Sequence, residues 1–272
     1  MTTITREFAN GELYHVFNRG VEKRNVFMDD SDYYRFIFSL YECNDAASVR
    51  VGARIAARRQ RNSTSNASSA RFHLASVQGE TLQNFETLQN SKPRKRELLV
   101  EIIAFVLMPN HYHLILRQLV DSGVSLFMKK LGNAYTGYFN DRYERKGMGA
   151  LFQGAFKAVH IDDDRQFLHL VEYVFSNPVE LVESDWKAKG VQDSVAAIEF
   201  LNDYKWSSYL DSVGAKNFPS VTTREFLWQV FAGSNDIQKG ILCVKESTES
   251  WIKNKSSLSA GLPTAQDLSP DR

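Results

Sequence analysis

The chain has 272 residues, of which 43% are hydrophobic and 24% are charged, as in ordinary soluble globular proteins. It contains no run of about 18 apolar residues that could span a membrane, and its start, MTTITREFAN, lacks the apolar core of a signal peptide. Cys43 and Cys243 are too few and too far apart for a disulfide framework or a cysteine-based zinc site, so we expect a cytoplasmic protein.

The net charge of +1 conceals an uneven distribution. Residues 1–160 carry 22 Lys and Arg against 15 Asp and Glu, whereas residues 161–272 carry 11 against 17. Most of the basic excess lies in residues 46–96, which hold ten basic and two acidic side chains. A polyanion would bind the basic part. A solvated basic loop explains the same residues equally well.

The first half of the chain predicts two elements followed by an insertion. Residues 12–20, ELYHVFNRG, have the pattern of a strand that ends in an Asn-Arg-Gly turn. Residues 29–44 begin with acidic side chains and continue with apolar residues on one helical face. Residues 46–97 are polar and contain the tandem hexamers ETLQNF and ETLQNS at 80–91. A flexible insertion explains this segment, because so long a structureless loop does not belong inside a compact fold.

The next part of the chain predicts a β-hairpin and three further elements. They are a hairpin of 97–108 and 111–117 joined by Pro109-Asn110, a helix at 122–142, a short strand at 154–161 and a helix at 163–177. Residues Asp162–Asp164 can cap the last helix and Pro178 ends it.

The order strand, helix, strand, strand, helix, strand predicts an α+β fold. We expect a ferredoxin-like sandwich with a central antiparallel sheet and helices on its faces. The expected domain covers residues 1–210. It is followed by a helical C-terminal appendage at 211–252 and a disordered tail at 253–272.

Two histidines in the stretch LMPNHYHLIL are candidate metal ligands. On a strand, His111 and His113 share one face and lie about 7 Å apart along it, so their imidazoles can converge on one ion. A half-buried pair satisfied by hydrogen bonds is the alternative. A metal site also needs a third ligand, and no carboxylate follows in LILRQ.

The helix at 163–177 supplies a candidate partner for the histidines. At about 100° per residue its apolar side chains form one arc, and Tyr173 lies roughly 140° from the centre of that arc. Asn177 lies one turn further on the same flank. A tyrosine and an amide on one face could together approach a two-histidine metal site. The alternative is a surface tyrosine with Asn177 as a C-cap before Pro178.

Four separated motifs of the chain resemble one family. His-Tyr-His fits the His-hydrophobic-His motif of the HUH single-strand endonucleases. The phrases YHVFNRGVEKRNVF, LMPNHYHLIL, EYVFSNPVE and YKWSSY look like the REP-associated tyrosine transposases, which are relatives of the small single-tyrosine insertion-sequence transposases. The resemblance runs from about residue 12 to 210 and is interrupted by the insertion at 46–97.

The resemblance implies a role for each matching residue. His111, His113 and Asn177 would hold a divalent cation, Mg²⁺ or Mn²⁺, and Tyr173 would be the nucleophile that attacks single-stranded or hairpin DNA. The product would be a 5′-phosphotyrosine and a free 3′-hydroxyl, and a second 3′-hydroxyl could reverse the step and join strands. A monomer or a homodimer without a membrane partner is expected.

The basic residues near these motifs are candidate DNA contacts. Arg19 and Arg24 lie in and after the Asn-Arg-Gly turn, where phosphate binding and surface solvation are equal alternatives. The family often has Trp-Gln-Gly-Arg-Phe before the last strand, but this chain has FQGAF at 152–156. Ala155 therefore replaces an expected DNA-binding arginine, and Lys157 is expected to substitute in part.

Two other functions remain alternatives at this point. One is a domesticated protein that binds hairpin DNA without cleaving it. The other is an unrelated two-histidine metal hydrolase, in which Tyr173 would be dispensable. His15 is expected to be a packed or hydrogen-bonded histidine rather than a ligand, and Tyr135 and Tyr138 are expected in the core.

Overall fold

A computed structural model describes residues 7–47, 96–145 and 147–254. Most of the predicted insertion and nearly all of the predicted disordered tail therefore lie outside the described residues. The chain divides into two compact units. Unit 1 comprises Met1–Phe8, Met28–Val100 and Leu119–Gly149, and unit 2 comprises Ala9–Phe27, Glu101–Gln118 and Ala150–Arg272.

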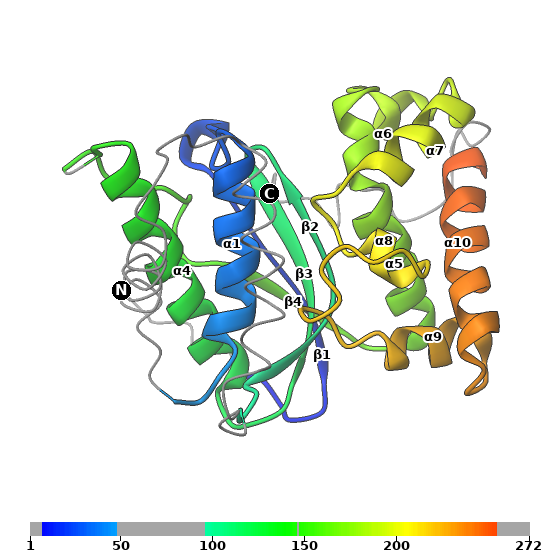
Figure 1. Ribbon diagram of the computed structural model, residues 1–272, viewed down its shortest axis with the longest axis horizontal. Helices are drawn as coiled ribbons and strands as arrows, with labels where there is room; N and C mark the ends of the chain where they lie inside the picture. Colours follow the sequence, from blue (N-terminus) through cyan, green and yellow to red (C-terminus); the bar gives the residue numbers. More distant parts are fainter. Residues whose placement is uncertain (1–6, 48–95, 146, 255–272) are drawn as a thin grey trace, which may run out of the picture. The chain divides into compact units, whose positions relative to one another are not determined.

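A four-stranded sheet is the centre of unit 2 (Figure 1). Its strands are β1 (Leu13–Arg19), β2 (Val100–Met108), β3 (His111–Gln118) and β4 (Lys157–Ile161). The spatial order is β2-β3-β1-β4, and β1 runs antiparallel to both of its neighbours. This order, with one helix between β1 and β2 and one between β3 and β4, is that of a ferredoxin-like βαββαβ fold.

The helices complete the predicted order of elements. The longer helices are α1 (Asp30–Cys43), α4 (Gly123–Arg142), α5 (Asp164–Ser176), α7 (Ser194–Asp203), α9 (Glu225–Ala232) and α10 (Ile237–Asn254). The short ones are η1 (Val21–Lys23), η2 (Asn177–Leu181), α6 (Trp186–Lys189) and α8 (Tyr209–Ser212). The predicted α+β class with an antiparallel sheet and C-terminal helices is confirmed. None of the helices within the described ranges is long and apolar enough to cross a membrane.

Segments that follow α7 cover the outer edge of β2. The amide of Leu107 donates to the carbonyl of Trp206 at 2.9 Å, and the amide of Ser208 donates to the carbonyl of Phe105 at 3.0 Å. These bonds pair backbone groups that an edge strand would otherwise leave exposed. The Trp-Ser-Ser-Tyr motif at 206–209 therefore packs along this edge of the sheet.

Helix α5 is buried on more than its apolar arc. Asp163 caps its first turn by accepting from the amide of Gln166 at 2.7 Å. The side chains of Phe167 and Phe226 pack with ring centroids 5.3 Å apart, which joins α5 to α9. Towards α10, the hydroxyl of Ser247 donates to the carboxylate of Glu172. The C-terminal helices thus cover one side of α5, and its other side is left to cover the sheet of unit 2.

A buried carboxylate organises unit 1. Asp32 of α1 accepts from the hydroxyl groups of Tyr138 and Tyr143 at 2.9 and 2.8 Å, from the Arg142 guanidinium at 3.0 Å and from the Met28 amide at 2.8 Å. Its side chain is fully buried. Because four groups donate to this carboxylate, its negative charge is compensated inside the unit. The hydrogen bonds to Tyr138 and Arg142 join α1 to α4.

Replacing Asp32 with Asn should destabilise the protein. The substitution removes the negative charge that compensates Arg142. It also replaces an acceptor oxygen with an NH₂ group that faces hydrogen-bond donors of the cluster. We therefore expect the free energy of unfolding to fall by about 3 kcal/mol. Asp30→Asn, in the same helical turn, is the matched control and should cost at most about 1 kcal/mol. Urea denaturation followed by circular dichroism measures both, and equal effects of the two substitutions would contradict the role of the cluster.

A histidine between two carboxylates joins the start of β1 to the end of β4. The imidazole of His160 lies 2.8 Å from a carboxylate oxygen of Glu12 and 2.6 Å from one of Asp162. The hydrogen bond to Glu12, aided by Asp162, raises the pKa of His160 above its usual value.

The His160 clamp should stabilise the fold only while the imidazole is charged. Its contribution is present at pH values below about 6.5, the usual pKa of His, and is lost as the pH rises through the raised pKa of the folded state. An NMR titration should give a pKa of His160 above the usual value, and Glu12→Gln should lower it. An unshifted titration in the unsubstituted protein would show that the clamp does not form.

Candidate active site

The pairing of β1 with β3 places the predicted histidines on one face of the sheet. In this register Arg19 is opposite His111, Phe17 is opposite His113 and His15 is opposite Ile115. Side chains that alternate along a strand put all of these on the same side. Tyr112, between the two histidines, projects to the other side and packs edge-on against Phe152 at 5.8 Å.

His111 lies between two amide side chains. Its Nδ1 is 2.6 Å from Oδ1 of Asn110, and its Nε2 is 3.2 Å from Oδ1 of Asn177. Because an amide oxygen only accepts hydrogen bonds, the short contact with Asn110 requires the proton on Nδ1. The Nε2 atom of His111 then carries a lone pair and points towards Asn177.

His113 is held by a histidine of the neighbouring strand. Its Nδ1 lies 2.8 Å from Nε2 of His15, and the two rings stack with centroids 5.0 Å apart. His113 is 0% exposed and His15 is 1% exposed. Burial lowers the pKa of His15 to about 3, so this imidazole is neutral at neutral pH. The prediction that His15 is a hydrogen-bonded histidine matches this contact.

Tyr173 packs against the histidines rather than projecting into solvent. Its ring meets His113 edge-on at 5.4 Å and His15 edge-on at 6.5 Å, and only 3% of the residue is exposed. The sequence pattern places Tyr173 on the polar side of its helix, but its side chain is buried. The flank that carries Tyr173 and Asn177 faces the sheet, because the C-terminal helices cover α5 elsewhere.

The three basic candidates differ in their surroundings. Arg19 is 9% exposed and lies on the same sheet face as His111. Lys157 is opposite Phe17, on that face too, with its ammonium 6.0 Å from the phenyl ring. Arg24 belongs to the loop after η1 and keeps 37% of its side chain exposed, while its Nε donates to the carbonyl of Val21 at 3.2 Å.

The loop that carries Arg24 has a tightly fixed backbone. A Cβ atom on Gly20 would lie 2.2 Å from the carbonyl oxygen of Arg24, so only glycine fits at this position. Glu22 and Lys23 both adopt positive φ angles, 55° and 59°. The amide of Gly20 donates to the carbonyl of Asn110 at 2.8 Å, which ties this loop to the residue that contacts His111.

The donor set at His111 fits a divalent cation. Two acceptors, Nε2 of His111 and Oδ1 of Asn177, lie 3.2 Å apart. Ligands bound about 2.1 Å from one octahedral ion are separated by about 3 Å when they occupy adjacent positions. The Nδ2 atom of Asn177 is buried without a hydrogen bond within the described ranges. Turning the amide over would let Nδ2 donate to Nε2 of His111, so the orientation with Oδ1 towards His111 is the one that suits a cation between the two acceptors.

His113 can contribute its second ring nitrogen to the same ion. Its Nδ1 is occupied by His15, which leaves Nε2 as the ligating atom. Within the described ranges no three His, Cys, Asp or Glu side chains converge as a metal-binding group. The candidate set of His111, His113 and Asn177 is of a different kind, two neutral imidazoles and one amide.

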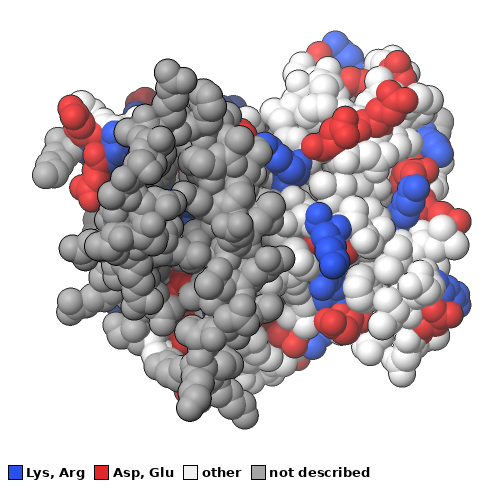
Figure 2. Space-filling view, viewed as in Figure 1, with Lys and Arg blue, Asp and Glu red and all other residues white. Residues whose placement is uncertain are grey.

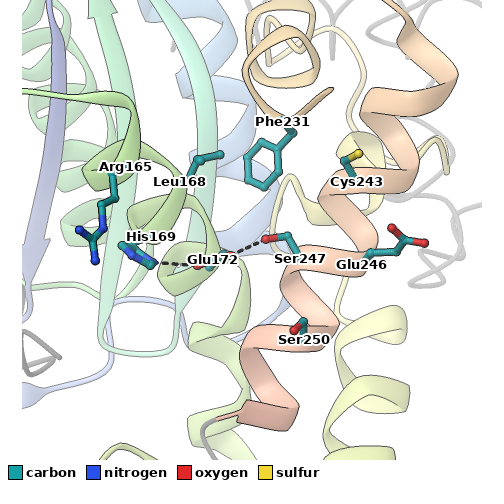
Figure 3. Close-up of a pocket in the computed structure, with 9 residues that line it drawn as sticks. All are labelled: Arg165, Leu168, His169, Glu172, Phe231, Cys243, Glu246, Ser247 and Ser250. Carbon is teal, nitrogen blue, oxygen red and sulfur yellow. Dashed lines mark hydrogen bonds and ion pairs between the residues drawn. The ribbon is translucent and has the colours of Figure 1, made fainter. Parts of the chain in front are cut away.

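A separate pocket of about 600 Å³ lies among α5, α9 and α10 (Figure 3). Leu168 and Phe231 form its apolar part, and His169 and Ser247 both contact Glu172 at its wall. None of the candidate metal ligands lines it.

Side chains of both charge signs are interspersed on the helical part of unit 2, which shows no extended basic surface in this view (Figure 2).

One protein-family model matches part of the chain. The family model described as "Transposase IS200 like" matches residues 71–177. This match confirms, over that segment, the predicted relationship with insertion-sequence transposases. It begins inside the predicted insertion at 46–97 and ends at Asn177.

A solved structure is also similar to the chain. It is titled "Structure of the REP associates tyrosine transposase bound to a REP hairpin", and it has 14% sequence identity and a TM-score of 0.42. The alignment covers 82% of this chain and 92% of that one. No curated protein matches the chain.

Removing either of the two adjacent candidate ligands, His111 or Asn177, should weaken metal binding. We expect His111→Ala and Asn177→Ala each to lower the affinity for Mn²⁺ by at least about 10-fold, since substitutions of groups that merely support ligands cost that much. His169→Ala, at a partly exposed histidine of α5 away from the candidate ligands, is the control and should bind as the unsubstituted protein does. Titration of Mn²⁺ followed by electron paramagnetic resonance measures the affinities, and unchanged binding in both ligand variants would refute the site.

Proposed function

Residues 71–177 match the IS200-like transposases, and from this match we propose that the protein is a metal-dependent, single-tyrosine transposase. Its substrate would be single-stranded or hairpin DNA, which it cleaves and joins. Tyr173 is the nucleophile, and His111, His113 and Asn177 hold Mg²⁺ or Mn²⁺. The cytoplasmic location and the choice between monomer and homodimer are parts of the same proposal.

One observation carries this proposal. Tyr173 and Asn177, which lie about 60 residues after the histidines, meet them on the same face of the sheet. The ring of Tyr173 packs on His113 at 5.4 Å, and the amide of Asn177 is 3.2 Å from His111. A nucleophile beside a candidate metal site is the arrangement that phosphoryl transfer to a tyrosine requires.

The reaction exchanges one phosphate ester for another. The phenolic oxygen of Tyr173 attacks the phosphorus and loses its proton, the bond from phosphorus to the 3′ oxygen breaks, and that oxygen leaves as a 3′-hydroxyl. The 5′ end of the DNA is then esterified to Tyr173. Because the ester is conserved, attack by another 3′-hydroxyl reverses the step and joins strands without an external energy source.

The side chains of the site prepare this reaction. The divalent ion, when bound, polarises the scissile phosphate and offsets its developing charge. Asn110 keeps the proton of His111 on Nδ1, so Nε2 is available as a ligand. Tyr173 lies in α5 and Asn177 directly follows the helix as its C-cap, one turn further on. The histidine strand β3 is a central strand of the sheet, so both ligand supports are regular elements.

Three basic residues are proposed as DNA contacts. Arg24 keeps 37% of its side chain exposed and can meet a backbone phosphate directly. Lys157 and Arg19 lie on the sheet face of the histidines, where positive charge favours a phosphate at the site. Ala155 offers no replacement for the arginine that the family often carries.

Loss of the tyrosine hydroxyl should abolish the covalent step. With a labelled hairpin-bearing single strand and Mn²⁺, the unsubstituted protein should form a protein–DNA adduct that resists denaturation. Tyr173→Phe should form none, and neither should His111→Ala or a reaction that contains a chelator. A gel that resolves free from protein-linked DNA measures the adduct.

Tyr112→Phe is the matched control for this experiment. It removes a hydroxyl from another buried tyrosine, which lies between His111 and His113 in sequence but on the opposite face of β3. This substitution should leave the adduct unchanged. Cleavage that survives Tyr173→Phe would contradict the nucleophile. Specific hairpin binding without cleavage in any metal would instead favour a DNA-binding protein that has lost catalysis.

A further inference from the structure

A buried pair of imidazoles lies next to the proposed metal site. His15 of β1 and His113 of β3 approach through Nε2 and Nδ1 at 2.8 Å. The Phe17 ring packs on both of them, with centroids 4.8 Å from His15 and 5.7 Å from His113. Packing on these sides fixes the ring planes, so the contact is a fixed feature of the core.

The shared proton of this contact decides what the other side of His113 can do. Two neutral imidazoles that share one hydrogen bond have two arrangements. If His15 donates from Nε2, the proton of His113 lies on its Nε2, which then cannot bind a metal. If His113 donates from Nδ1, its Nε2 carries a lone pair and can bind a metal.

We propose that His15 is a positioning residue that accepts the Nδ1 proton of His113 and so presents Nε2 of His113 to the divalent ion, an inference that rests on the proposed metal site. Asn110 does the same for His111 through its amide oxygen. The two ligands would thus have analogous supports, one from a loop amide and one from a buried histidine.

His15 differs from Asn110 because it can also donate. When His15 accepts from His113, its own proton lies on Nδ1, and this buried atom makes no hydrogen bond within the described ranges. The protein therefore does not itself fix this arrangement, whereas the amide oxygen of Asn110 can only accept and fixes the proton of His111 on Nδ1. Metal binding at His113 supplies the free energy that selects it, so ion occupancy and the position of the proton are coupled.

The test compares the Mn²⁺ affinities of full-length variants by electron paramagnetic resonance, with folding checked by circular dichroism. His15→Leu removes the acceptor and should weaken binding about 10- to 100-fold. His15→Gln restores an acceptor oxygen and should recover part of that loss. His169→Leu makes the same change at a partly exposed histidine of α5 and should bind as the unsubstituted protein does.

NMR of the ring nitrogens gives a second measurement that does not need a variant. In the Mg²⁺-loaded protein, His113 should carry its proton on Nδ1 and His15 on its own Nδ1. A proton on Nε2 of His113 with Mg²⁺ bound, or unchanged Mn²⁺ affinity in folded His15→Leu, would overturn the inference alone. If the unsubstituted protein binds no Mn²⁺, or binds it as tightly as His111→Ala does, the proposed function fails and the inference fails with it.

Discussion

The register between β1 and β3 is the constraint on which the candidate site depends. Phe17 opposite His113 brings His15 within hydrogen-bonding distance of that histidine and sets Arg19 beside His111. A shift of one residue would turn every β1 side chain to the other face and separate these groups. Burial of the face under α5 opposes such a slip, because the shift would place Tyr14, Val16 and Asn18 on the face that now holds His15, Phe17 and Arg19.

Local patterns in the sequence were sufficient for the framework of this site. The two-residue period of a strand puts His111 and His113 on one face whatever their neighbours are, and the 3.6-residue period of a helix puts Asn177 one turn beyond Tyr173. Caps and breakers set the ends, as Asp163 does for α5. The fold class follows from the order of such elements, so it too was predictable.

Contacts between distant segments were beyond those patterns. The period of α5 alone leaves open whether Tyr173 projects into solvent or towards another element, and the answer depends on α9 and α10, which follow it by about 50 residues or more. The partner of His15 depends on a register that one strand does not encode. For the same reason the burial of Arg19 gives no signal in the turn motif that contains it, where an exposed arginine would look identical.

The chemistry of the donor set follows from these buried contacts. His111, His113 and Asn177 offer neutral atoms, and His15 is neutral behind them because its pKa is lowered to about 3. A site without carboxylates leaves the charge of a bound divalent ion uncompensated by protein, so a DNA phosphate would be its natural counter-charge. Tyr173 and His113 are almost completely buried, and side chains that cover them must therefore move before a phosphate can reach both. Metal and DNA are then expected to bind this site with positive coupling, since each supplies the charge that the other lacks.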